Sequence, residues 1–85
     1  MAKLTKAEQK WIDDAQAVLN RCPSTRLGFY TMGDHSVHVY NLDQLDEVSD
    51  LMDKGKHDFC QATKDTDADF NESLDFPSPV ESTAG

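Results

Sequence analysis

The apolar residues near the start of the chain repeat with the period of an α-helix. They recur at three- and four-residue spacing, and the set comprises Ala7, Trp11, Ala15, Val18 and Cys22, with Ile12 and Leu19 widening the stripe. Thr5 and Glu8 form a capping box, which marks the beginning of a helix. Asn20 and Pro23 mark its end near residues 20–21. The pattern predicts an amphipathic helix with Trp11 in the core.

Two short runs with the character of β-strands follow. Residues 26–32 and 37–41 are rich in β-branched and aromatic residues, and a turn-forming sequence at 33–36 separates them. We expect an antiparallel hairpin whose apolar face packs on helices, because an isolated hairpin is only marginally stable in water. That face would carry Leu27, Phe29, Thr31, Val37 and Val39. Tyr30 and Tyr40 lie on the opposite face, where we expect partial exposure.

From residue 42 the helical period returns, and apolar and acidic positions separate onto two sides. The apolar side comprises Leu42, Leu45, Val48 and Met52, supported by Leu51. The acidic side comprises Asp43, Asp46, Glu47, Asp50 and Asp53. Gly55 stands where a helix would end.

The last third of the chain has weaker signals. A third helix is predicted between about residues 56 and 75, with a stripe of Phe59, Ala62, Thr63, Phe70 and Leu74. Residues 76–85 contain two prolines and small polar residues, which predicts a flexible C-terminal tail. We therefore expect one α+β domain over residues 1–75, in the order α-β-β-α(-α), with its helices packed on a two-stranded antiparallel hairpin.

Charge is distributed unevenly along the 85 residues. Residues 1–30 carry five Lys and Arg against three acids, a net +2, whereas residues 31–85 carry thirteen acids against three lysines, a net −10. The total is −8. Such a field repels nucleic acid and anionic membranes and attracts basic proteins. We expect neither direct binding to nucleic acid nor a membrane role.

The sequence contains two arrangements of potential metal ligands. Asp65, Asp67 and Asp69 match the first half of an EF-hand loop, but Phe70 and Phe76 stand where that loop needs Gly and Glu. For zinc, the available side chains are Cys22, Cys60, His35, His38 and His57. Only one pair of these, the histidines at 35 and 38, is closely spaced, whereas structural zinc sites use paired ligands. No metal or other cofactor is expected.

The sequence also lacks the patterns of known catalytic sites. It has no glycine-rich phosphate loop and no Gly-x-Ser-x-Gly motif. A nucleophilic cysteine needs electropositive surroundings, and most of this chain is strongly negative. Two cysteines are too few for a disulfide framework, so we expect free thiols in a cytoplasmic protein. We expect a protein that is not an enzyme.

The acidic side of the predicted helix after residue 42 is a candidate site for a protein partner. A row of carboxylates can resemble DNA phosphates and so bind a basic DNA-handling protein. The simpler interpretation is a solvated helix surface. Tyr30, Tyr40 and the tail offer other contacts. The alternative function is a nucleic-acid-binding regulator that uses Lys3, Lys6 and Lys10 of the first helix. The oligomeric state is left open.

Three segments resemble a known group of proteins. These are residues 19–34, the motif Val37-x-Val39-Tyr40, and the ending from Phe76 to Gly85. Together they are similar to small uncharacterised accessory proteins of lambdoid phages and enterobacterial prophages. The resemblance implies a bacterial cytoplasm as location and, for many such proteins, modulation of a host factor. It assigns no functional residue.

Overall fold

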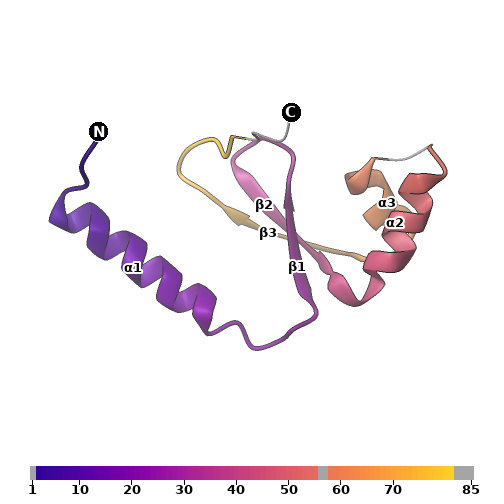
Figure 1. Ribbon diagram of the computed structural model, residues 1–85, viewed down its shortest axis with the longest axis horizontal. Helices are drawn as coiled ribbons and strands as arrows, with labels where there is room; N and C mark the ends of the chain where they lie inside the picture. The colour runs from indigo at the N-terminus through magenta and orange to yellow at the C-terminus, as the bar shows by residue number, and fades with distance from the viewer. Residues whose placement is uncertain (1, 56–57, 82–85) are drawn as a thin grey trace.

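The computed structural model describes residues 2–55 and 58–81, which form a small α+β fold (Figure 1). The elements, in chain order, are α1 (Lys6–Asn20), β1 (Leu27–Thr31), β2 (Ser36–Asn41), the 3-10 helix η1 (Leu42–Gln44), α2 (Leu45–Asp53), α3 (Phe59–Asp65) and β3 (Asp69–Asp75). The predicted fold class and the order of the first four elements are confirmed. Within the described ranges, no helix combines the length and apolar character needed to cross a membrane.

The sheet has three antiparallel strands in the order β1-β2-β3, rather than the two predicted. The predicted helix between residues 56 and 75 is wrong in its second half. α3 ends at Asp65, because Asp67 takes a left-handed backbone conformation (φ 61°) and the Ala68 amide donates to the Thr63 carbonyl. The following residues form β3. Phe70 and Leu74 fitted the helical stripe because a spacing of four residues suits strands as well as helices.

α1 begins and is stabilised as the sequence predicts. The Thr5 amide donates to Glu8 Oε1 at 2.8 Å, and the Glu8 amide donates to Thr5 Oγ1 at 3.1 Å, which completes the capping box. Three side-chain pairs four residues apart bridge successive turns: Gln9 with Asp13, Lys10 with Asp14, and Gln16 with Asn20. All of these interactions lie within the helix or its cap.

The predicted position of Trp11 in the core is wrong. No residue of α1 is buried, and the Trp11 side chain is 59% exposed. Figure 1 shows the reason: α1 lies to the left of the sheet, while α2 and α3 lie at its other side. The radius of gyration is 15.5 Å, compared with about 12 Å for a compact chain of this length.

The face of the sheet that α2 and α3 cover is the opposite of the one predicted. It carries Tyr30, His38 and Tyr40, and the rings of Tyr30 and Tyr40 each lie 5.1 Å from the Phe59 ring, centroid to centroid. Tyr40 is only 5% exposed, so its predicted partial exposure is wrong. The Tyr40 ring fits there because Gly28, opposite it on β1, has no side chain. Tyr30 is partly buried, as expected.

The core is small and lies where α2, α3 and the start of β3 meet. Val48, Ala62 and Ala68 form it, and Leu51 and Phe59 pack against it. The apolar side predicted for the second helix is therefore rotated: Leu42, Leu45 and Met52 are 36–38% exposed. The reason is that α3 packs on the side of α2 that carries Val48 and Leu51.

The segment after β3 is joined to the turn between β1 and β2. The Phe76 amide donates to the His35 carbonyl at 2.7 Å, and the Val80 amide donates to the Asp34 carbonyl at 2.8 Å. Flexibility of the tail from residue 76 stays a prediction, and its last part, residues 82–85, lies outside the described residues.

A methyl group at position 28 should destabilise the fold. An ideal Cβ on Gly28 would lie 2.5 Å from Tyr40 Cε1. Gly28→Ala should therefore reduce the free energy of unfolding by about 1–3 kcal/mol in denaturant titrations, a range typical of overpacking. Combining it with Tyr40→Leu should cost less than the sum of the two single changes, because the steric conflict is removed. Strict additivity would show that the Tyr40 ring does not occupy this space.

Candidate functional site

The face of the sheet away from α2 and α3 is apolar and uncovered. It carries Leu27 and Phe29 from β1, Val37 and Val39 from β2, Leu74 from β3, and Phe76 directly after β3. Register supports this grouping, since Phe29 pairs with Val39, and Val37 with Leu74. Phe29 is 48% exposed, Leu74 45% and Phe76 41%. We expected helices on this face, but within the described ranges no helix packs on it, and the end of α1 borders it at Val18 and Leu19.

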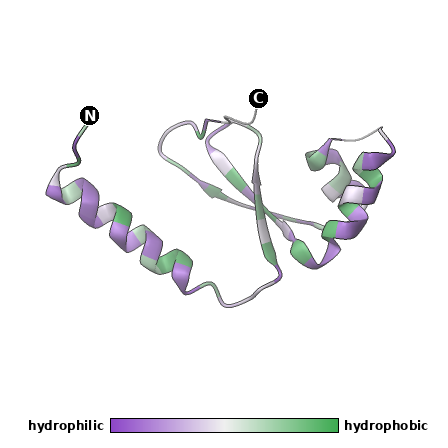
Figure 2. Ribbon diagram, in the orientation of Figure 1, coloured by the Kyte–Doolittle hydropathy of each residue, from purple (hydrophilic) through white to green (hydrophobic). Residues whose placement is uncertain are grey.

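α1 presents a second uncovered apolar surface. Trp11, Ile12, Val18 and Leu19 are each between 42% and 60% exposed. Figure 2 shows hydrophobic segments on α1 and along the strands, outside the small core. The amphipathic character of α1 was predicted correctly, but the large side chains of its apolar side are exposed.

The two surfaces border the same space. One groove of about 500 Å³ lies between the end of α1, at Val18 and Leu19, and the uncovered sheet face. A second groove of about 430 Å³ extends along α1 from Trp11 through Ala15 and reaches Phe76. We call the two grooves and the apolar side chains that line them the open apolar surface. It is accessible to an apolar element of another molecule.

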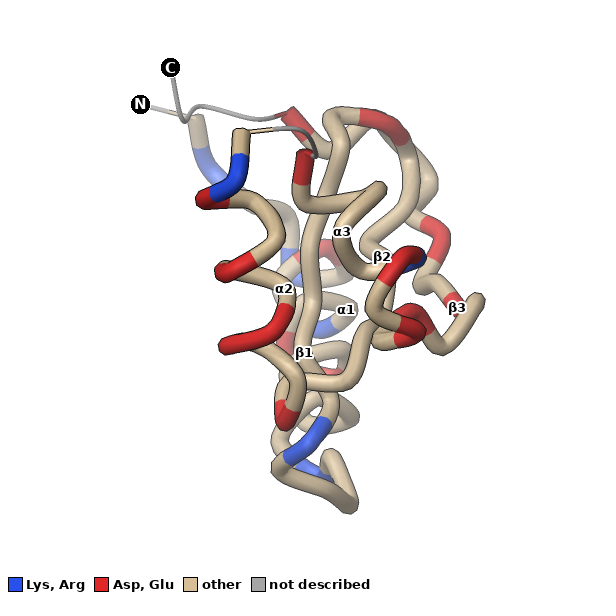
Figure 3. The backbone as a smooth tube through the Cα atoms, turned by 90° about the vertical axis from the view of Figure 1, so that its right-hand side faces the viewer, with Lys and Arg blue, Asp and Glu red and all other residues tan. Residues whose placement is uncertain are grey.

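The acidic side of the second helix is arranged as predicted. Asp43, Asp46, Glu47, Asp50 and Asp53 are all exposed, and Figure 3 shows the acidic positions of α2 along one side of the molecule. In the described ranges, none of the five forms an ion pair. Among the described residues, their only side-chain hydrogen bond is from Gln44 Nε2 to Glu47 Oε2, at 3.4 Å. The carboxylates are thus free to interact with a positively charged surface.

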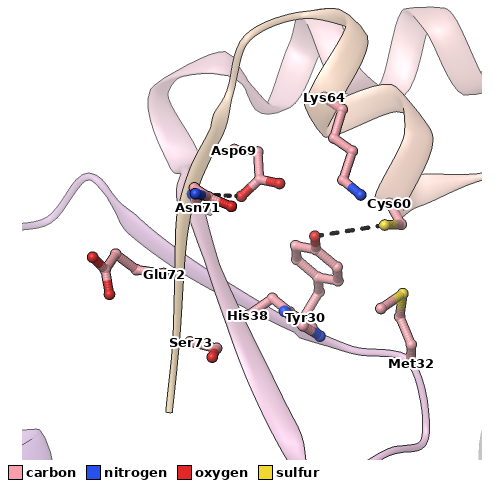
Figure 4. A pocket seen from close by; sticks show the side chains of 9 residues that line it. All are labelled: Tyr30, Met32, His38, Cys60, Lys64, Asp69, Asn71, Glu72 and Ser73. Atoms are coloured by element: carbon pink, nitrogen blue, oxygen red, sulfur yellow. Dashed lines mark hydrogen bonds between the residues drawn. The ribbon is translucent and has the colours of Figure 1, made fainter.

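A small polar pocket lies between the sheet and α3 (Figure 4). Its volume is about 260 Å³, and Tyr30, His38, Cys60, Lys64 and Asp69 are among its lining residues. The Tyr30 hydroxyl donates to Cys60 Sγ at 3.9 Å, and the Tyr30 ring stacks on the His38 ring at 5.2 Å. Burial raises the pKa of Tyr30 above its ordinary value, an interaction with Thr63 offsets part of this rise, and the contact with Cys60 adds to it.

His38 has a buried ring nitrogen, Nε2, without a hydrogen bond among the described residues of this region. The nearest carboxylate oxygen that could pair with it, Asp34 Oδ2, is 3.8 Å away, which is too far for a hydrogen bond. In the part of the chain described, no three His, Cys, Asp or Glu side chains are placed to hold a metal ion.

The residues considered as zinc ligands are dispersed. Cys22 is exposed at the end of α1, whereas Cys60 lies beside Tyr30 on α3, and both thiols are free. His38 is in the pocket and His35 in the turn before β2, while His57 lies outside the described residues. The residues predicted to bind a partner do not form one surface. Tyr40 is buried, Tyr30 is partly buried, and the acidic side of α2 faces solvent.

Comparison with known proteins leaves the chain without an assigned relative. No family model matches it, and no curated protein and no solved structure is significantly similar to it. The function must therefore be argued from the surfaces described above.

The Asp75 carboxylate links β3 to β2 next to the open apolar surface. Its lowered pKa makes this link sensitive to acid. Its Oδ1 accepts from Ser36 Oγ at 2.7 Å and from Ser73 Oγ at 3.1 Å, and these hydrogen bonds lower the pKa of the carboxyl. A lowered folded-state pKa stabilises the fold above the unfolded-state pKa, and the contribution is lost as the pH falls through the folded-state value.

We therefore expect Asp75→Asn to remove part of the acid dependence of unfolding. Melting temperatures measured between about pH 7 and about pH 2 should fall less steeply for this variant than for the wild type. Asp50→Asn is the control, because the Asp50 carboxylate forms no hydrogen bond within the described ranges. If both variants change the slope equally, the hydrogen bonds of Asp75 do not contribute.

Proposed function

We propose that this chain is a non-enzymatic protein-binding module that associates with protein through its open apolar surface. The observation that supports this most directly is the exposure of Trp11, Val18, Phe29 and Leu74 around shared grooves. Large contiguous apolar patches on small proteins are usually interaction sites, because leaving them in water is unfavourable by roughly 25 cal/mol per Å².

The resemblance to accessory proteins of lambdoid phages and prophages gives this proposal a setting. Its partner would be a host or phage protein, or another copy of the chain, in the bacterial cytoplasm. The alternative, a nucleic-acid-binding regulator that uses the basic first helix, has less support. Of its lysines, Lys10 is paired with Asp14 at 2.9 Å, and the same helix exposes a broad apolar side. Phosphate binding needs clustered free cations.

Affinity capture from a bacterial lysate tests the role of the open apolar surface. Phe29→Asp places a charge in the centre of the uncovered sheet face and should abolish co-purification of the specific partner, because the charge would have to lose its hydration. Ser49→Asp, at an exposed position of α2, adds the same charge elsewhere and should leave capture intact. Equal capture by both variants would contradict the proposal.

The acidic side of α2 supports a second candidate function, the binding of a basic DNA-handling protein. The specific observation is that its five carboxylates are exposed and form no ion pair in the described ranges. Unbalanced carboxylates at three- and four-residue spacing destabilise a helix slightly, by a few tenths of a kcal/mol per pair. A function in binding would explain why no lysines alternate with them.

Reversing two of these charges should slow association with a captured basic protein. For Asp46→Lys combined with Asp50→Lys, we expect a lower association rate and a weaker dependence on ionic strength, because a charged surface mainly steers encounter. Asp13→Lys combined with Glu81→Lys makes the same change of net charge away from α2. Stopped-flow measurements over a range of salt concentrations compare the two. Identical rates for both double variants would show that the acidic side only keeps the protein in solution.

A further inference from the structure

The uncovered parts of this chain are complementary to each other. Among the described residues, α2 and α3 cover one face of the sheet, and the large apolar side chains of α1 are exposed beside the other face. A helix packed on a sheet is a stable two-layer arrangement, and the dimensions agree. α1, with 15 residues, is about 22 Å long, and strands of five to seven residues span roughly 17–23 Å.

We infer that the open apolar surface binds a second copy of this chain, with α1 of each copy packed on the uncovered sheet face of the other. This inference rests on the proposed function and names the partner. A two-fold arrangement satisfies both surfaces at once, because each copy donates one helix and accepts one. Each donated helix would fill the grooves between the acceptor's own α1 and sheet.

The exposed area is of the size that such a dimer requires. The chain exposes 6712 Å², whereas a compact protein of 9.5 kDa exposes about 5,000 Å². The excess is about 1,700 Å² per chain, to which the chain ends also contribute. Stable interfaces bury about 800 Å² per partner, and obligate ones more. Covering half of the excess on each copy would therefore be sufficient.

The connection between α1 and β1 favours packing of α1 on the sheet of a second copy over packing on its own sheet. Only residues 21–26 join the two elements, and Pro23 restricts both its own backbone and that of Cys22 to extended conformations. The Cys22 thiol donates to the Ser24 carbonyl at 3.4 Å, and the Arg26 amide donates to Ser24 Oγ at 3.1 Å. In this conformation the helix is held beside its own sheet with the grooves between them unfilled.

Charge contributes little to this arrangement. The net +2 of residues 1–30 comes from Lys3, Arg21 and Arg26 outside α1, whereas α1 itself carries two lysines against three acids, a net −1. Asp75 lines the groove that α1 borders and is one carboxylate at the rim. Since each complete chain carries −8, two copies repel each other overall. Apolar burial must provide the affinity.

The mass in solution and the fluorescence of Trp11 test the inference together. Sedimentation equilibrium of the full chain at micromolar concentrations should give about twice 9.5 kDa. Trp11, the only tryptophan, should emit at short wavelength in the dimer, and its emission should shift to the red on dilution.

Two variants of α1 make a matched pair. Ala15→Asp places a carboxylate on the apolar side, at the groove, and should weaken dimerisation at least about tenfold, because a charge would be buried without a partner. Ala17→Asp makes the same substitution at an exposed position that does not line the grooves, and should dimerise like the wild type. Far-UV circular dichroism shows whether each variant keeps its secondary structure.

Cross-linking between two different chains shows which elements meet. Both native cysteines are replaced (Cys22→Ser, Cys60→Ser); one chain then carries Ala15→Cys and a size tag, and the other carries Phe29→Cys. A short bis-maleimide should join the tagged to the untagged chain, because α1 of one lies on the sheet of the other. A chain with Ala17→Cys in place of Ala15→Cys should give much less of this product.

Three other combinations of mass, Trp11 emission and cross-linking would contradict the inference, each in a different way. A single-chain mass with red-shifted Trp11 emission would exclude the second copy but leave the open apolar surface free for a different protein. A single-chain mass with short-wavelength emission would mean that α1 covers its own sheet, which removes the proposed binding surface as well. A dimer that Ala15→Asp does not weaken, and that gives no cross-link, would exclude the exchange of α1.

Discussion

The whole arrangement depends on the aromatic contacts that join one face of the sheet to α3. Tyr30 and Tyr40 both meet Phe59, and Gly28 gives the Tyr40 ring its space. These contacts attach the sheet to the small core of Val48, Ala62 and Ala68. Because they occupy the side of the sheet that faces α2 and α3, the side with Leu27, Phe29 and Val39 stays uncovered. The exposed surface is therefore a direct result of which face the core uses.

The sequence predicts local features of this fold better than the way its layers combine. The capping box of Thr5 and Glu8, the hairpin and the acidic side of α2 follow from short-range patterns, and the structure confirms them. Alternation along a strand shows which residues share a face, but it does not show which face meets the helices. The more hydrophobic face, with Phe29 and Val39, is the one that the sequence predicts to meet the helices. In the structure the helices pack on the other face, where Gly28 leaves space for the Tyr40 ring.

The third strand and the open apolar surface could not be predicted for related reasons. β3 contains no β-branched residue, the type that indicates a strand. It contains instead Asp69, Asn71, Glu72 and Asp75, which are uncommon in strands. It forms because β2 offers an edge for hydrogen bonding. The apolar side of α1 was visible in the sequence, but a hydrophobic stripe does not specify whether the surface that covers it belongs to the same molecule.

The isolation of α1 makes its helical state part of any association that involves it. A 15-residue helix with few tertiary contacts is only marginally stable in water, and this one is held by its capping box and three side-chain pairs. A partner can bind the apolar side only when residues 6–20 are helical. If they are not, binding must order them at an entropic cost. In the association proposed above, Thr5, Glu8 and Asp14 would therefore influence affinity by stabilising the helix, from positions on the cap and the polar side. Selection could tune affinity there without altering the contact surface.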